Sequence, residues 1–513
     1  METELKFDVD PAAADQLLEE LALASKGEEQ ILKSVYYDTA DEALRGRGLA
    51  LRVRDDGEKR IQTIKQSTAR AFERGEWEQQ IEGTAPDMAA AADTPLGKLM
   101  AGKDASLLRP AFEVTVERAK REMAVGDGVV EVALDRGAVS ADGYGSPICE
   151  LELELKSGAP ALLFELAREL AERAPLDLSF ISKAERGYAL MDGELLAPVR
   201  AKRPALSAED TAETAFRAIA ATTLSQITAN ARVLRAARRP EAVHQLRVGV
   251  RRLRTAIGLF GDLLADERRE SLIAELKWIA GELDEARNLD VFLSETFRPG
   301  AARRRETPGM SALGASLLAA QTRAYNRVEK AVRSRRFSRL TLELAAWVET
   351  GDWCRDESPA RAALRRRPAA ELAAEILADR HRKVVRRGRK LEDLSVEARH
   401  RLRIQAKRLR YAGDFFAALY KGKAARRRAT LTKALAAFQD GLGELNDIAV
   451  GAEMIVRLVG AAPGEAAQSR RKPDFAQAFA AGQIWADREA GAALAMKASL
   501  KAYKTLAEAK PYW

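Results

Sequence analysis

The first residues of the chain place charged side chains at alternate positions. Glu2, Glu4 and Lys6 are each separated by one residue of another kind, so on a β-strand the three side chains share one face. Two carboxylates beside an ammonium group can hold a hard divalent cation and contact an anion. Taken alone, the pattern is equally well explained by a solvated strand face.

The same alternation recurs at later points in the chain, which favours a common structural role for these charged strand faces. If these strands face one another inside a closed barrel, their charged faces form a polar tunnel, and their apolar faces pack outward against helices. Carboxylates in such a tunnel could bind a metal, and Arg and Lys could bind the oxygens of a polyanion. The alternating sets are Arg52 with Arg54, Thr63 with Lys65, Glu76 with Glu78, and Glu150, Glu152 and Glu154 with Lys156.

The elements that must position these residues are mainly strands. Residues 1–195 contain roughly eight segments with strand patterns, separated by turns such as Asp55-Asp56-Gly57. Amphipathic helices are expected over 11–25 and 160–173. The N-terminal part is therefore expected to be a mainly antiparallel β-structure with helices outside.

A change of composition divides the chain. Strand signals almost vanish after the Pro-containing, basic stretch 196–206, and Ala, Leu, Arg and Glu then recur at helical spacing. We expect a β-domain over 1–197, a linker over 198–206 and an all-α domain over 207–513, hence an α+β multidomain protein. The first 200 residues carry 25 Lys and Arg against 39 Asp and Glu, a net charge of −14, and the remainder carries 59 against 37, a net charge of +22. The basic part is expected to bind a polyanion.

The helical part contains an internal repeat. HQLRVGVRRLR begins at His244 and HRLRIQAKRLR begins at His400, 156 residues later. LDEARNLDV from Leu283 and LGELNDIAV from Leu442 follow the two copies. Two pseudo-symmetric helical bundles are the expected architecture.

Each copy of the repeat places basic residues on one helix face. Positions i, i+3, i+7 and i+10 lie within about 80° around a helix, and apolar residues such as Leu246 and Leu253 form an adjacent face. Arg and Lys on such a face suit an extended phosphate chain, and His adds a pH-dependent donor. A solvated face or a nucleic-acid surface are the alternatives, but no aromatic residues for base stacking are interleaved. The first stripe is His244, Arg247, Arg251 and Arg254, and the second is His400, Arg403, Lys407 and Arg410, with Arg408 beside it.

The ordered motifs of the N-terminal part resemble the CYTH, or triphosphate tunnel metalloenzyme, family. They are the initial E-x-E-x-K, YYDT, LRVR, TIK, ELELELK and SKAERGY. The resemblance implies an eight-stranded antiparallel β-barrel tunnel that hydrolyses a triphosphate with Mg²⁺ or Mn²⁺. It implies a metal-binding role for Glu2, Glu4, Glu150, Glu152 and Glu154, a catalytic, triphosphate-binding role for Lys6, Arg52, Arg54, Lys65, Arg118 and Lys183, and further tunnel positions at Glu76, Glu78, Asp135 and Arg186.

The repeat is similar to the CHAD family, the conserved-histidine α-helical domain, over about residues 205–510. This similarity implies two helical bundles whose basic stripes bind inorganic polyphosphate. The sequence departs from the family at Asn288, where Asp is more common, although Asp290 is retained. His381 lies outside the repeat and is expected to be an ordinary helix or surface residue.

We therefore expect an inorganic triphosphatase joined to a polyphosphate-binding domain. Thiamine or nucleoside triphosphates are alternative substrates, and a non-catalytic polyphosphate-binding or granule scaffold is the alternative from another class. The sequence shows no signal peptide and no membrane span, and Cys149 and Cys354 offer no disulfide framework. A cytoplasmic location, with association to polyphosphate granules, is the resulting expectation. Nucleic acid and membranes are disfavoured as partners.

Overall fold

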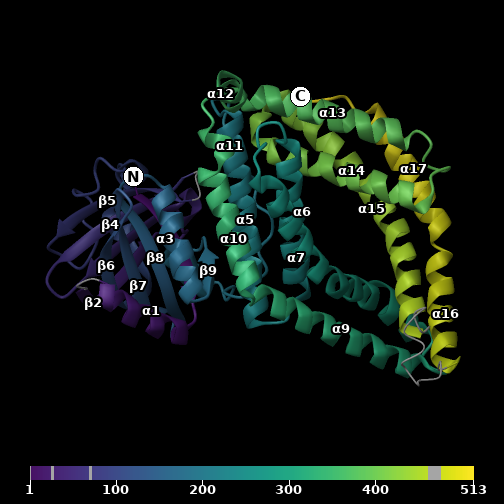
Figure 1. Cartoon of the computed structure of the whole chain (residues 1–513), viewed down its shortest axis with the longest axis horizontal. Coiled ribbons are helices and arrows are strands. Elements are labelled where there is room, and N and C mark those ends of the chain that lie inside the picture. The colour runs from purple at the N-terminus through teal and green to yellow at the C-terminus, as the bar shows by residue number, and fades with distance from the viewer. Residues whose placement is uncertain (1, 25–27, 69–71, 460–474) are drawn as a thin grey trace. The chain divides into compact units, whose positions relative to one another are not determined.

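A computed structural model describes residues 2–24, 28–68, 72–459 and 475–513 (Figure 1). The chain forms two compact units. The first comprises Met1–Arg200 together with Ala220–Ala237 and Val332–Arg355. The second comprises Ala201–Ile219, Arg238–Ala331 and Asp356–Trp513. The first unit thus combines the N-terminal β-structure with two segments from the helical part of the sequence.

The β-structure is a closed antiparallel barrel. Its strands follow the order β5-β4-β3-β2-β6-β7-β8-β1, and pairing of β1 with β5 closes the ring. This confirms the expected eight-stranded barrel, to which β9 adds an extra strand beside β1. The strands are β1 (Glu2–Val9), β2 (Glu28–Asp38), β3 (Leu49–Asp55), β4 (Arg60–Ser67), β5 (Glu73–Ile81), β6 (Arg109–Val125), β7 (Gly128–Ala141), β8 (Tyr144–Ser157) and β9 (Leu176–Ser179).

Apolar side chains of the strands point outward beneath helices, as expected. Leu49, Leu51 and Val53 of β3 belong to a buried core that also contains Leu96 and Leu99 of α2 (Pro95–Met100). Leu151 and Leu153 of β8, which contacts α3 (Ala161–Arg173), are fully buried. The predicted helix at residues 11–25 is present as α1 (Pro11–Ala24).

Strand register brings charged residues of several strands to the same interior level. Asp8 lies opposite Glu150, Glu150 opposite Asp135, and Asp135 opposite Arg118. Directly opposite residues of antiparallel strands point to the same face. The register therefore gathers carboxylates of β1, β7 and β8 next to a guanidinium of β6. We call the charged interior of the barrel the tunnel.

The short helix α4 (Lys183–Met191) brings two cations, Lys183 and Arg186, to the tunnel. Ser182 and Glu185 form a capping box that fixes its first turn. The helix packs on β6, β7 and β8, and this approach requires a glycine. A Cβ atom on Gly187 would lie 2.1 Å from the Phe112 ring, so any larger residue would push α4 away from the barrel.

The rest of the chain is helical, as predicted. The first stripe lies on α6 and the second on α14, and these two helices contact each other. Within the described ranges, every helix is too short or too polar to cross a lipid bilayer. The helices are α5 (Ala212–Ala236), α6 (Pro240–Leu259), α7 (Arg268–Val291), α8 (Arg298–Arg303), α9 (Met310–Val332), α10 (Arg335–Thr350), α11 (Asp352–Arg355), α12 (Pro359–Arg366), α13 (Ala369–Gly388), α14 (Val396–Phe415), α15 (Gly422–Val459), α16 (Phe475–Glu489) and α17 (Ala492–Glu508).

Gly187→Ala is expected to destabilise the barrel by about 1–3 kcal/mol, the usual cost of overpacking, because its methyl group must displace Phe112 or α4. Thermal unfolding of the full chain measures this effect. Gly46→Ala is the matched control, since a Cβ at Gly46 meets no atom within 4 Å. Equal melting temperatures for the two variants would contradict the close approach of α4.

Candidate functional site

The centre of the tunnel is one ammonium group surrounded by carboxylates. Lys183 Nζ lies 2.8 Å from Asp135 Oδ2, 2.9 Å from Glu150 Oε2 and 2.8 Å from Glu152 Oε1. Burial opposes the charge on Lys183, but these three carboxylates outweigh burial and raise its pKa well above the ordinary value. Lys183 is therefore a permanent cation near neutral pH.

A second ammonium group bridges two acidic strands. Lys6 Nζ lies 3.1 Å from Glu4 Oε1 and 3.1 Å from Glu152 Oε1. Arg74 of β5 reaches Glu4 from the other side at 3.5 Å. Burial opposes the charge on Lys6, yet Glu152 and Glu4 raise its pKa. Lys6 consequently cannot serve as a neutral general base at physiological pH.

We call the carboxylates of β1, β7 and β8 that face the tunnel the acidic wall. Two arginines, Arg118 and Arg186, pair with carboxylates of this wall. Arg118 contacts Asp135 and Glu152, each at 2.6 Å. Arg186 of α4 contacts Asp8 at 2.9 Å and Glu150 at 2.7 Å. Burial would raise the pKa of Glu152, but Lys183, Lys6 and Arg118 together hold that pKa well below its usual range.

The wall formed by β3, β4 and β5 carries the other predicted basic residues. Lys65 lies 3.0 Å from Glu76, and Arg52 lies 3.7 Å from Glu78. Arg54 differs, because in the described part of the chain it forms no ion pair and its buried Nε has no hydrogen-bond partner. Burial and the neighbouring charges of Arg52 and Arg118 lower the pKa of Arg54 to about 10. Arg54 is thus a half-buried cation with a buried Nε, and no carboxylate of the described residues contacts it, although Glu78 favours its charge from a longer distance.

The tunnel unites most residues predicted for it, and it also contains some that sequence analysis missed. Glu154 lies nearer one end, 2.9 Å from Lys156, while the side chain of Glu2 falls outside the described residues. Asp8, Arg74 and Glu131 were not predicted. Asp8 and Glu131 continue the alternation of β1 and β7, which was an available signal, whereas Arg74 is brought in by barrel closure.

The donor set of the tunnel fits a hard divalent cation. Carboxylate oxygens are the ligands that Mg²⁺ prefers, and Glu4 and Glu152 both converge on Lys6. Glu4 Oε1 is buried against the charged groups of Lys6 and Arg74, with no further hydrogen bond within the described ranges. In the same ranges no group of three or more Asp, Glu, His or Cys side chains forms a ready metal-binding arrangement. Lys and Arg side chains pair with these acids instead.

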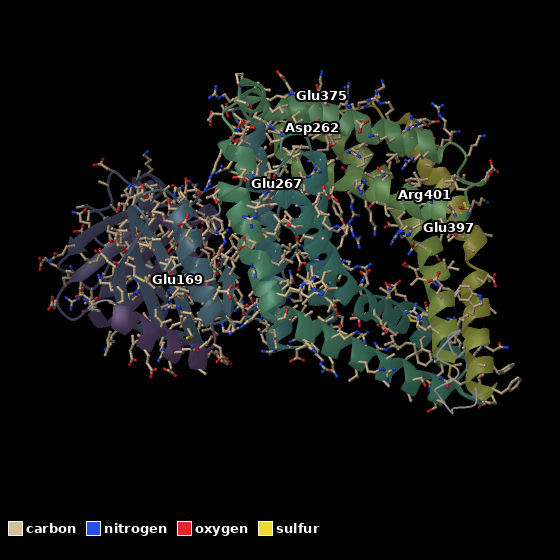
Figure 2. The ribbon with its side chains drawn as sticks, viewed as in Figure 1. Glu169, Asp262, Glu267, Glu375, Glu397 and Arg401 are labelled. Carbon is tan, nitrogen blue, oxygen red and sulfur yellow. The ribbon has the colours of Figure 1, made fainter. Side chains whose placement is uncertain are left out.

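The second site lies in the helical unit, where the two stripes meet. The charges that act on Lys407 of the second stripe include Arg251 and Arg247 of α6 as well as Arg403 and Arg410 of its own helix. Figure 2 shows nitrogen-tipped side chains in the region between α6 and α14. Residues 156 positions apart in the sequence thus form one basic surface.

On this surface, burial and like charges lower the pKa values of basic groups, whereas in the tunnel opposite charges raise the pKa values of Lys6 and Lys183. Burial, followed by Arg251, Arg403 and Arg247, lowers the pKa of Lys407 to about 6. Burial and Arg287 lower the pKa of His244 to about 4, so His244 is neutral at pH 7. The cations here repel each other, and nearby carboxylates such as Asp284 and Asp447 compensate them only in part.

Other polar residues of the helical unit contact neighbouring helices. Arg247 lies 2.8 Å from Asp284 on α7, and His400 Nδ1 lies 2.7 Å from Asn446 Oδ1 on α15. Asp290 accepts hydrogen bonds from Tyr325 and Gln321, which directs it toward α9.

His381 lies against Trp513 and the Leu506 carbonyl group. Those contacts make it a packing residue, in line with the expectation from sequence.

Comparisons with known proteins match both parts of the chain. The CYTH domain model matches residues 1–188, and the CHAD domain model matches residues 218–456. A curated relative, an inorganic triphosphatase from Haemophilus influenzae (strain ATCC 51907 / DSM 11121 / KW20 / Rd), is 31% identical over 202 residues, which are 38% of this chain and 56% of that protein. The chain thus spans about half the length of this relative.

Two solved structures are similar to parts of the chain. The CHAD domain from the plant Ricinus communis is 30% identical, with a TM-score of 0.50, and the match covers 60% of this chain and 96% of that one. PptA from Streptomyces chartreusis is 18% identical, with a TM-score of 0.43, and the match covers 57% of this chain and 100% of that one.

Arg251→Ala is expected to raise the pKa of Lys407 from about 6 toward the ordinary lysine value, because it removes the like charge that lowers this pKa most. NMR titration of lysine side chains in the full chain measures this pKa. Arg401→Ala removes a charge from the exposed part of α14, labelled in Figure 2, and should leave the titration unchanged. A Lys407 pKa that is insensitive to Arg251 would contradict the meeting of the two stripes.

Proposed function

The chain belongs to the CYTH family through its residues 1–188 and to the CHAD family through its residues 218–456, and from this membership we propose that it is a metal-dependent inorganic triphosphatase with a polyphosphate-binding domain. The tunnel hydrolyses the triphosphate, and the helical domain binds the polymer. Arg54 is the observation that carries the first part, because it is a half-buried cation, with a buried Nε, that no carboxylate contacts in the described structure.

Anion binding follows from the charge balance of the tunnel walls. Carboxylates of β1, β7 and β8 are already paired with Lys6, Arg118 and Lys183. Arg54 forms no ion pair in the described structure and is repelled by its neighbours Arg52 and Arg118, so a bound phosphate group would relieve that repulsion. Guanidinium groups suit phosphate oxygens because they can bind two at once.

The titration behaviour of the tunnel argues against a lysine or histidine as nucleophile or general base. Lys6 and Lys183 stay protonated because nearby carboxylates raise their pKa values, and the three histidines of the chain all lie at or after His244. The nucleophile is therefore water. The five proposed ligands, among them Glu4, Glu150 and Glu152, would hold Mg²⁺ or Mn²⁺, which when bound supplies Lewis-acid activation and neutralises phosphate charge.

Inorganic triphosphate is the proposed substrate because the basic residues of the described tunnel suit phosphate groups. The curated relative named an inorganic triphosphatase supports the same choice. Thiamine and nucleoside triphosphates share the triphosphate group and are the competing substrates. A scaffold without turnover is the competing function.

Polyphosphate binding by the helical domain rests on the crowding of like charges. Arg247, Arg251, Arg403 and Lys407 lie together on two contacting helices, where burial makes their mutual repulsion costly. A polyanion would remove this cost and restore the charge on Lys407. The domain would thereby place the enzyme on polyphosphate, including polyphosphate granules.

Arg54→Ala is expected to lower kcat/KM for inorganic triphosphate about a hundredfold, the usual effect of removing one oriented charge from a transition-state site. Phosphate release with Mg²⁺ is the assay, and Arg60→Ala is the control because Arg60 pairs with Asp55 on a half-exposed part of β4. Activity should also vanish in EDTA and in Glu4→Gln. No release from inorganic, thiamine or nucleoside triphosphates under any of these conditions would support the scaffold function instead.

Polyphosphate affinity is expected to fall as pH rises above about 6, because Lys407 is charged in the free protein only below that value. Binding at pH 7 should therefore take up protons, which calorimetry in buffers of different ionisation enthalpy detects. Lys407→Arg should flatten the pH dependence. Arg403→Ala should weaken binding about tenfold or more, and Arg401→Ala should weaken it much less. Proton release on binding would be the contrary result.

A further inference from the structure

The helix α13 carries two arginines that no repeat motif includes. Arg380 and Arg387 are seven residues apart, so they lie about 20° from each other around the helix. Val384 between them is fully buried, which places the pair beside the face that packs into the domain. We call these two residues the α13 pair.

The α13 pair lies next to the end of the basic stripes. The charges that act on Arg408 of α14 are those of Arg380 and Arg387, together with Arg254 of α6. α13 and α14 pack against each other. Four guanidinium groups from three helices therefore gather at the end of the first stripe, to which Arg254 belongs.

Carboxylates compensate this cluster poorly. Among the described residues, Arg254, Arg387 and Arg408 form no ion pair. Arg380 lies 3.8 Å from Asp379, but Lys383 holds the same carboxylate oxygen at 2.7 Å. The Nε atom of Arg380 is buried and, within the same ranges, has no hydrogen-bond partner. The arrangement resembles that of the stripes, where like charges face one another.

The corresponding helix of the first repeat is used differently. α5 precedes α6 as α13 precedes α14, and its Arg235 lies 2.7 Å from Asp177 of β9, within the first compact unit. Arg235 also donates a hydrogen bond to the Val332 carbonyl group. Arg235, one of the three arginines of α5, is thus engaged in packing within the first unit, whereas the α13 pair remains poorly compensated. The two repeats therefore differ in how these helices use their arginines.

We propose that the polyanion-binding surface of the helical domain continues from the two stripes onto α13, through Arg254, Arg408 and the α13 pair, so that a long polyphosphate chain is held by three helices. This inference rests on the proposed polyphosphate binding. It adds a preference for long chains, because a short chain is satisfied by the stripes alone. The proposed extension lies on the second repeat only, since the first repeat has no equivalent extension among the described residues.

The test compares variants of the full chain for binding to long-chain and short-chain inorganic polyphosphate, in EDTA so that metal-dependent hydrolysis is suppressed. R380A/R387A should weaken long-chain binding about tenfold and reduce the slope of log affinity against log salt by one to two, roughly one for each phosphate group that the variant no longer neutralises. Short-chain binding should change less than about twofold.

The matched control is R382A/R386A, which removes the same charge from the exposed, opposite side of α13 and should weaken long-chain binding less than about threefold. R380K/R387K keeps the charge and should retain most of the affinity, which guards against a folding defect in the alanine variant. Equal losses for the two alanine variants, or equal effects on long and short chains, would overturn the extension. Unchanged binding of both chain lengths in Arg403→Ala would instead overturn the proposed polyphosphate site itself.

Discussion

The Lys183 ammonium group, held by three carboxylates from two adjacent strands, is the interaction on which the tunnel depends. A charge buried in a barrel interior is costly unless it is paired and hydrogen-bonded, so Asp135, Glu150 and Glu152 need a cation at that point. The cation arrives on α4, and α4 can approach only because Gly187 leaves room for Phe112. Register, helix capping and one glycine therefore serve a single electrostatic requirement.

The two sites of this protein differ in how far their charged residues are paired with opposite charges. In the tunnel, nearly every charge of the acidic wall has a partner, and the pKa values of Lys6 and Lys183 rise as a result. On the helical surface, burial and like charges lower the pKa values of Lys407 and Arg247. The first arrangement leaves Arg54 without an ion pair in the described structure, and the second leaves positive charge only partly compensated. These two features are the basis of the proposed triphosphate and polyphosphate binding.

Much of the architecture was predictable from local patterns. The alternation of Glu4 with Lys6, and of Arg52 with Arg54, indicated which side chains share a strand face, and the barrel confirms it. The repeat at His244 and His400 indicated two related helical pairs. Arg74 was not predictable in the tunnel, because it contacts Glu4 through the closure of the ring between β1 and β5. No local pattern encodes that pairing.

The sequence by itself determined which charged residues can act together within one element, since residue spacing sets the angle between side chains on a strand or a helix. It also determined that positive charge exceeds negative charge in the helical part. Tertiary structure alone decided which cations remain poorly compensated, namely Arg54, Lys407 and the α13 pair. The physical reason is that ion pairing and burial depend on distances through space, and packing sets these distances between residues that lie far apart along the chain.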